Sequence, residues 1–175
     1  MTIFDLLKEV TVALEKRNIP YMVSGSMAMV VYTVSRTTRD IDIVIELSKG
    51  SLEGFYEIFK ANFHLHKPTV EEELSRRGMF NAIDHRSGMK IDFVIRKNSL
   101  YRKTEFERKR RDLLFGQEVW VVSIEDLILS KLIWIQDIKS DRQMEDIKSL
   151  LDCPHDINYV KKWTSELALN CFKLI

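Results

Sequence analysis

Apolar residues recur at helical spacing along much of the 175-residue chain. Near the start, Ile3, Leu6, Leu7, Val10 and Leu14 predict an amphipathic helix over residues 2–17, which the run Asn18-Ile19-Pro20 ends. Similar spacing or mostly apolar composition predicts further helices over 26–34, 52–62, 123–138, 141–151 and 158–172, with a short helical piece over 71–77.

Short apolar runs bounded by turn residues predict strands over 21–24, 41–47, 80–84, 90–95 and 119–122. The third and fourth of these flank Arg86-Ser87-Gly88, which predicts a hairpin. The pattern changes from sheet-like to helix-like at about residue 123. We therefore expect an α/β (α+β) fold: a mixed sheet with helices packed on it and a helical C-terminal part.

The length and the apolar content of 45% suffice for one compact core. We expect residues 1–122 to form an α/β core and residues 123–175 a helical part packed on it, as a single compact unit. The net charge of +1 gives no global field that would attract nucleic acid or membrane, so any such contact needs a local patch.

The two cysteines, Cys153 and Cys171, lack the spacing of metal ligands and indicate buried or incidental thiols in a reducing compartment. No apolar run is long enough to span a bilayer. The first residues lack a basic region followed by an apolar stretch, so no signal peptide is expected. These features predict a cytoplasmic protein that does not enter the membrane.

Gly25-Ser26 follows a predicted strand and opens a predicted helix. Glycine allows a phosphate to approach the backbone closely, and a helix N-terminus offers free N–H groups and partial positive charge. Taken alone, Ser24-Gly25-Ser26 is also an ordinary turn and helix cap, and for the isolated tripeptide that interpretation is favoured.

Asp40 and Asp42 begin a strongly apolar strand and project from the same face, because side chains alternate along a strand. Two neighbouring carboxylates repel each other unless a cation lies between them. Hard oxygen ligands suit Mg²⁺, which proteins hold through one or two carboxylates plus substrate phosphates. In the alternative, Asp40 is a turn residue and Arg39 is the partner that Asp42 needs in a strand buried on both faces.

Asp92 repeats this pattern within the apolar run 89–95. If the two strands are neighbours in one sheet, three carboxylates converge at one edge and form a two-metal nucleotide site. Asp92 is then the favoured catalytic base or second-metal ligand. The alternative for Asp92 is a salt bridge to Lys90 or Arg96.

Together, the Gly-Ser turn, the thirteen-residue gap over 27–39, the Asp-x-Asp pair and the later strand Asp resemble the nucleotidyltransferase superfamily, which has the polymerase-beta-like fold. The resemblance implies transfer of a nucleoside monophosphate from an NTP to an acceptor hydroxyl or phosphate, with Mg²⁺ as cofactor and Mn²⁺ as the alternative ion. It implies that Gly25 and Ser26 bind the triphosphate. It also implies that Asp40, Asp42 and Asp92 are the catalytic and metal-binding residues.

The runs 123–132 and 141–147, with Thr37-Thr38 before the metal strand, resemble the AbiEii-like group of small bacterial nucleotidyltransferases. That group includes toxin components of toxin–antitoxin systems, so the resemblance implies a possible antitoxin partner. It also implies that Lys131, Arg142 and Asp146 bind the nucleotide, with Lys131 placing a point charge on a phosphate.

Each of these C-terminal residues also has a plainer interpretation. Lys131 could be a snorkelling residue of an amphipathic helix, about as readily as a phosphate ligand. Asp146 could be a polar partner of Lys148 or Arg142 on one helix face.

The acceptor stays open between tRNA, a protein hydroxyl and a small molecule such as an aminoglycoside. The helical part is too short to form a large acceptor-binding domain. The alternative function is a module that binds Mg-NTP, as a sensor, without transfer.

A basic cluster, in which Tyr101 and Phe106 lie close in sequence, could contact an RNA backbone, although a solvated helix end is favoured. The cluster consists of Lys103, Arg108, Lys109, Arg110 and Arg111. His64-x-His66 is expected to be a surface pair rather than a metal site. The remaining aromatic and sulfur side chains are expected in the core, namely Trp120, Trp134, Trp163, Met22, Met27 and Met29.

Overall fold

The computed structural model of the chain describes residues 1–34, 38 and 40–175. Within these residues, seven strands form one sheet in the order β3-β4-β5-β2-β1-β7-β6. The strands are β1 (Tyr21–Ser24), β2 (Asp40–Ile45), β3 (Phe63–His64), β4 (Met79–Asp84), β5 (Lys90–Ile95), β6 (Arg110–Leu114) and β7 (Gln117–Val121). The pairs β2–β5 and β1–β7 are parallel, and the other pairs are antiparallel. The mixed sheet confirms the predicted fold class.

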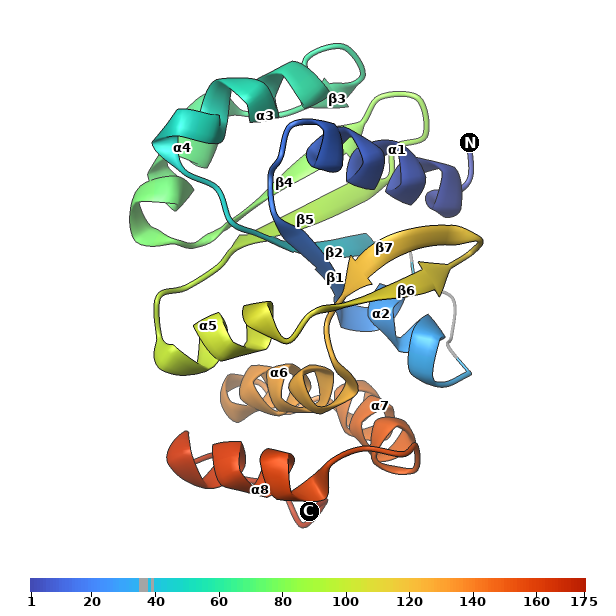
Figure 1. Ribbon diagram of the computed structural model, residues 1–175, viewed down its shortest axis with the longest axis vertical. Helices are drawn as coiled ribbons and strands as arrows, with labels where there is room; N and C mark the ends of the chain where they lie inside the picture. Colours follow the sequence, from blue (N-terminus) through green and yellow to red (C-terminus); the bar gives the residue numbers. More distant parts are fainter. Residues whose placement is uncertain (35–37, 39) are drawn as a thin grey trace.

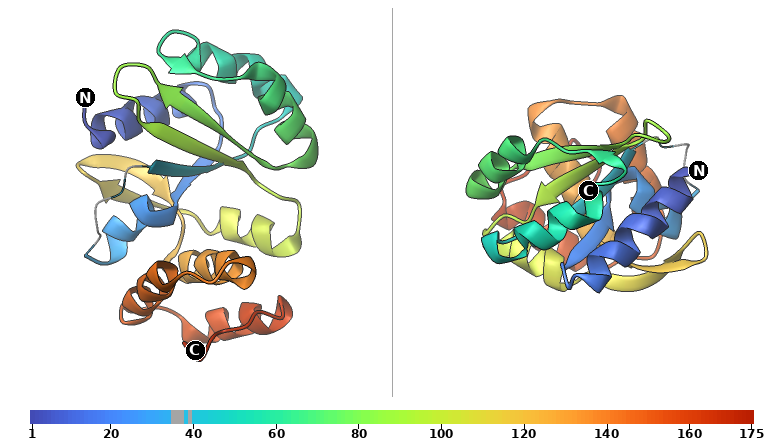
Figure 2. Two further views of the ribbon diagram at one scale, coloured as in Figure 1. Left: turned by 180° about the vertical axis from the view of Figure 1, so that it is seen from behind. Right: turned by 90° about the horizontal axis from the view of Figure 1, so that it is seen from above.

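The helices lie on both sides of this sheet (Figures 1 and 2). They are α1 (Ile3–Lys16), α2 (Gly25–Tyr32), α3 (Leu52–Phe59), α4 (Lys67–Arg76), α5 (Leu100–Glu107), α6 (Ile124–Asp137), α7 (Asp141–Leu151) and α8 (Ile157–Glu166), with a 3₁₀ turn over Lys49–Ser51. Helices α1, α3 and α4 lie toward one end of the molecule, whereas α6, α7 and α8 group at the opposite end (Figure 1). Of the described helices, none has the length and apolar character that a membrane span requires.

One face of the strands β4, β5, β2 and β1 is buried. Phe55 and Phe59 of α3 pack on Phe93 of β5, with ring centroids 5.3 Å apart in both pairs, and Phe80 of β4 completes the cluster. Burial of one such side chain contributes about 1.5–3 kcal/mol. The other face carries the site, so the aromatic cluster forms the rigid back of the site strands.

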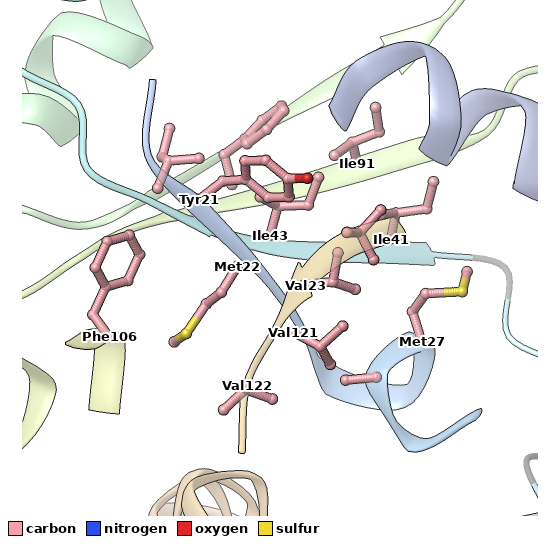
Figure 3. Packing of buried hydrophobic residues seen from close by; sticks show 14 of the residues in the cluster. Tyr21, Met22, Val23, Met27, Ile41, Ile43, Ile91, Phe106, Val121 and Val122 are labelled. Carbon is pink, nitrogen blue, oxygen red and sulfur yellow. The ribbon is translucent and has the colours of Figure 1, made fainter. Parts of the chain in front are cut away.

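The core continues across β1 to the opposite face. Tyr21 and Met22 point to opposite sides of β1: Tyr21 lies beside Ile43, and Met22 points toward Phe106 and Val122 (Figure 3). All of these side chains are at most 7% exposed. Strand β1 is therefore buried on both faces, which fixes the point where it passes into α2.

Buried Asp126 joins the C-terminal helices to α5. It accepts hydrogen bonds from Ser123 Oγ (2.7 Å), Arg108 Nε (3.0 Å) and the Tyr159 hydroxyl (2.9 Å). A buried carboxylate is stable only when it is paired and hydrogen-bonded, and Asp126 meets both conditions. The division into residues 1–122 and 123–175 stays a prediction.

Several predicted elements differ from the observed ones. The segment 100–114 holds α5 and the edge strand β6, where the sequence suggested only a solvated helix end. Strand β2 is fully buried on one face alone: Ile41, Ile43 and Ile45 are 0% exposed, whereas Asp42 and Val44 are half-buried. The predicted helical piece over 71–77 is longer and begins at Lys67, because Pro68 fits the first turn of a helix.

The expected core membership is confirmed for Met22, Met27, Met29 and Trp163. Trp120 is half-buried against the core. The prediction is wrong for Trp134, which is 60% exposed on α6. Helical apolar spacing marks a face of α6, but this part of that face has little packed against it.

Candidate active site

A row of polar side chains crosses four neighbouring strands on the face opposite the aromatic cluster. Ser24 of β1 is paired with Asp42 of β2, Asp42 with Asp92 of β5, and Asp92 with Asn81 of β4. Paired residues of adjacent strands point to the same face, and the strands are about 4.8 Å apart. The expectation that the two carboxylate strands are neighbours is therefore confirmed.

The surroundings of Asp42 disfavour its negative charge. Burial, followed by the charges of Asp92 and Asp40, raises the pKa of Asp42 from 3.8 to about 6, against the opposing effects of Lys131 and Lys90. A carboxyl group held in this state gains stability when a cation approaches, and such perturbed groups concentrate at functional sites.

Lys90 lies among the three carboxylates. Its Nζ is 2.8 Å from Asp92 Oδ2. Lys90 is also paired with Asp40 across the β2–β5 ladder. The hydrogen bond to Asp92, opposed by partial burial and aided by the charges of Asp40 and Asp42, raises the pKa of Lys90. The sequence left open a salt bridge from Asp92 to Lys90 or Arg96; Lys90 forms it, and Arg96 pairs with Glu46.

The donor set fits a hard divalent cation. Among the described residues, no group of three or more His, Cys, Asp or Glu side chains is already arranged around a common metal position. Mg²⁺ needs only one or two carboxylates, because phosphate oxygens and water complete its six ligands. Asp42, with its disfavoured charge, and its neighbours Asp40 and Asp92 supply oxygen donors of this kind.

Gly25 lies directly against the Asp42 side chain. Its φ is +59°, in the left-handed region, and a Cβ added there would lie 2.6 Å from Asp42 Cγ and 2.9 Å from Asp42 Cβ. Only glycine allows this approach. Helix α2 therefore starts beside the carboxylate row, with half-buried Ser26 in its first turn.

Lys131 projects from α6 into the protein interior and is 4% exposed. Its Nζ donates to Gln143 Oε1 and to Asp146 Oδ2 on α7, both at 2.9 Å. The snorkelling interpretation is therefore wrong for Lys131, and among the described residues Asp146 forms its ion pair with Lys131, not with Lys148 or Arg142. The positive charge of Lys131 acts on Asp42 and opposes the rise of its pKa.

Three further residues from the sequence predictions are not part of this arrangement. Arg142 is exposed in the first turn of α7. Arg39, suggested as a partner of Asp42, and Thr37, part of the AbiEii-like resemblance, lie outside the described residues. The nucleotide-binding roles of Gly25, Ser26, Lys131, Arg142 and Asp146 stay predictions.

The basic cluster near α5 is engaged in contacts within the protein. Arg108 pairs with Glu125 and Asp126, and Arg110 pairs with Asp112. Two further members of the cluster stack on aromatic rings: Lys109 on Phe106 and Trp120, and Arg111 on Trp120. These contacts favour a structural role, and RNA binding there stays a prediction.

Sequence reasoning did not single out Asn81. The strand prediction over 80–84 would place it on the same face as Ile83, and the hairpin around Ser87 would bring that strand beside the strand of Asp92. The register that pairs Asn81 with Asp92 depends on the geometry of the turn, which the residues alone do not specify.

Comparison with known protein families gives the class of the protein. The family model described as "Nucleotidyltransferase of unknown function (DUF6036)" matches residues 1–172, and the chain belongs to this family. The chain is thus a nucleotidyltransferase, as the residues of the site led us to expect. A comparison with curated protein sequences finds no match.

Several solved structures share the fold of this chain. The crystal structure of ANT(2'')-Ia in complex with adenylyl-2''-tobramycin has a TM-score of 0.64 and 14% identity, covering 96% of this chain and 98% of that chain. The lincosamide antibiotic adenylyltransferase LnuA, bound to lincomycin, has a TM-score of 0.55 and 14% identity, over 85% and 93% of the two chains. TM1012 from Thermotoga maritima has a TM-score of 0.55 and 15% identity, over 94% and 93%. The AbiEii-like resemblance stays a prediction.

Proposed function

We propose that the protein transfers a nucleoside monophosphate from an NTP to a hydroxyl of a small-molecule acceptor, with Mg²⁺ as cofactor. The observation that carries this proposal is Asp42. Its carboxylate is held between Gly25, at the start of α2, and Asp92, and its pKa is raised to about 6. A structural protein gains nothing from such a costly arrangement, whereas a cation and a triphosphate would relieve it.

Each side chain of the site has a role in the proposed reaction. The first turn of α2 at Gly25 and Ser26 binds phosphate oxygens through backbone N–H groups and the Ser26 hydroxyl. Lys131 directs a positive charge toward the same region. Asp40, Asp42 and Asp92 would hold the Mg²⁺, which supplies neutralisation of the phosphate charge and alignment of the reacting groups.

The transfer itself is a displacement at the α-phosphorus. The acceptor oxygen forms a bond to that phosphorus, the bond from phosphorus to the bridging oxygen of the β-phosphate breaks, and pyrophosphate leaves. Asp92 takes the proton of the acceptor hydroxyl. Positioning and charge stabilisation supply most of the catalysis in reactions of this type.

The structural neighbours support a small acceptor. ANT(2'')-Ia is seen with an adenylylated tobramycin and LnuA with lincomycin, and the chain is close to both in overall length. A tRNA or protein acceptor, a toxin activity and an antitoxin partner rest on the sequence resemblance alone and stay predictions.

The test is a transfer assay with each NTP labelled on the α-phosphate, Mg²⁺, and a panel of small molecules, total RNA and cell protein. Wild type runs beside Asp42→Asn, and Asp152→Asn, an exposed residue at the end of α7, is the matched control. We expect label on a small molecule with wild type and the control, and none with Asp42→Asn. Tight Mg-NTP binding without label on any acceptor would favour the sensor module instead.

A further inference from the structure

A cavity of about 270 Å³ lies at the edge of the sheet next to the carboxylate row. Met79, Phe80 and Asn81 of β4 form one wall, and the other is formed by His64 of β3, by His66, and by Thr69 and Val70 of α4. This volume is near the lower limit for ligand pockets and suits one small ring.

The cavity exists because β3 is short. Its two residues pair only with Ile83 and Asp84, so residues 79–82 of β4 have no described strand on their outer side. The chain turns away at His66 to begin α4, and Met79 and Asn81 stay exposed. This part of the sheet edge leaves open space for a ligand, and the Met79 backbone N–H there donates to Glu73 Oε2 (3.0 Å).

The cavity meets the polar row of the candidate active site at Asn81. Asn81 is paired with Asp92 across the β4–β5 ladder, and both side chains point to the face that carries Asp42. With strands about 4.8 Å apart, a hydroxyl that receives a hydrogen bond from the Asn81 amide lies within reach of the Asp92 carboxylate. Asp42 lies on the other side of Asp92 from Asn81, and Gly25 lies next to Asp42.

The side chains that line the cavity suit a neutral polar ligand. Asn81 and Thr69 offer uncharged donors and acceptors, and the Thr69 hydroxyl is 2.8 Å from His66 Nδ1. Met79, which is 50% exposed, offers an apolar surface for the face of a ring. The described residues that line the cavity include no carboxylate, which a polycationic ligand would need for charge pairing.

We propose that this cavity is the acceptor subsite, and that it takes a small neutral polyhydroxylated molecule of the sugar or nucleoside class. Asn81 holds the reactive hydroxyl beside Asp92, and His64, His66 and Thr69 hold the rest of the ring. The inference rests on the proposed function, and it separates this chain from an enzyme that modifies a polycationic aminoglycoside.

The first test is binding, observed through histidine ring resonances in nuclear magnetic resonance spectra. The chain has four histidines, so His64→Gln and His66→Gln assign the two cavity signals, and His155, outside the cavity, is the internal reference. The probes are glucose, inosine, lincomycin and tobramycin, each added to protein saturated with Mg-ATP. We expect glucose or inosine to shift the His64 and His66 signals while tobramycin does not. Shifts with tobramycin alone, or with none of the probes, would overturn the proposal.

The second test is kinetic and uses the acceptor that the transfer assay labels. Asn81→Ala should raise the KM for that acceptor about tenfold, the effect of one lost hydrogen bond, and leave Mg-ATP binding unchanged. Asn158→Ala, an exposed residue of α8, is the control and should change neither value.

The two tests separate the subsite from the function. An unchanged acceptor KM in Asn81→Ala, with transfer intact, would overturn the subsite while the proposed function stands. Histidine shifts without transfer to any acceptor would overturn the proposed function, and with it the acceptor role of the cavity.

Discussion

Gly25 and Asp42 are in direct contact: the Asp42 side chain occupies the space where any other residue at position 25 would place its Cβ. This contact fixes the start of α2 beside the carboxylate row. The phosphate-binding helix terminus and the metal-binding strand of the proposed mechanism are therefore positioned by one residue pair.

Gly25→Ala should abolish transfer. The substitution adds left-handed backbone strain of about 1–3 kcal/mol and forces the Asp42 carboxylate out of its position. Gly88→Ala is the matched control, because Gly88 has a φ of +70° but nothing within 4 Å of an added Cβ. Both variants should lose stability in urea denaturation through backbone strain, Gly25→Ala the more because of its contact with Asp42, and only Gly25→Ala should lose kcat/KM. Equal activity in the two variants would show that the Gly25 contact does not matter for catalysis.

Asp42→Asn should make the metal-free protein more stable at neutral pH. The folded pKa of about 6 lies above the ordinary value of 3.8, so the folded state binds the proton more tightly. The stability of wild type therefore falls as the pH rises from about 4 to about 6, by up to about 3 kcal/mol. Asp42→Asn removes this loss. Urea unfolding in EDTA, at a pH below 4 and at a pH above 6, measures the loss of stability in both proteins. Mg²⁺ should reduce the difference in stability between wild type and Asp42→Asn at the higher pH.

Asp84→Asn is the control of opposite sign. Burial favours a raised pKa for Asp84, but hydrogen bonds from Ser87 and Arg86 outweigh it and lower the pKa. Its ionised form therefore stabilises the fold above the ordinary carboxyl pKa, so Asp84→Asn should destabilise at neutral pH. A loss of stability in Asp42→Asn as well would mean that Asp42 is a structural carboxylate.

The sequence was sufficient for the central strands and the row of carboxylates. Asp42 and Asp92 each interrupt an apolar strand. A charged residue in an apolar strand needs a partner, so both positions can be recognised from the sequence without a structure. The residue type at Gly25 also indicated a place where a phosphate can approach the backbone closely. The contact between Gly25 and Asp42 was beyond sequence reasoning, because it depends on the antiparallel pairing of β1 with β2.

Other features depend on packing that no local pattern contains. Lys131 and Asp146 are fifteen residues apart, and only the packing of α6 on α7 buries them as a pair. Trp134 has an apolar side chain at a helical position, yet it is exposed because few groups cover that turn of α6. Strand β6 begins with Arg110 and Arg111, charges typical of an edge strand, which hide the alternation that predicts strands.

Lys90→Met should increase the affinity for Mg²⁺. The Lys90 ammonium partly neutralises Asp92 and acts on Asp40 and Asp42, so its removal leaves more negative charge for the cation. We expect the Mg²⁺ concentration needed to stabilise the protein to fall about tenfold, because the Lys90 charge lies about one strand spacing from the carboxylates. Thermal unfolding at increasing Mg²⁺ concentrations measures this without activity. Lys60→Met, an exposed lysine at the end of α3, is the control. An unchanged Mg²⁺ dependence in Lys90→Met would place the cation away from this row.

Lys131→Met separates the structural role of Lys131 from its proposed role toward the nucleotide. The variant removes the buried ion pair between Lys131 and Asp146, which should lower the stability of the fold. Adding Asp146→Leu should recover part of that stability, because a buried ion pair can be replaced by apolar residues. If Lys131 also interacts with the triphosphate, the double variant stays impaired, with a raised KM for the NTP at a temperature where it is folded. Recovery of both the stability and the KM for the NTP in the double variant would show that Lys131 has only the structural role of joining α6 to α7.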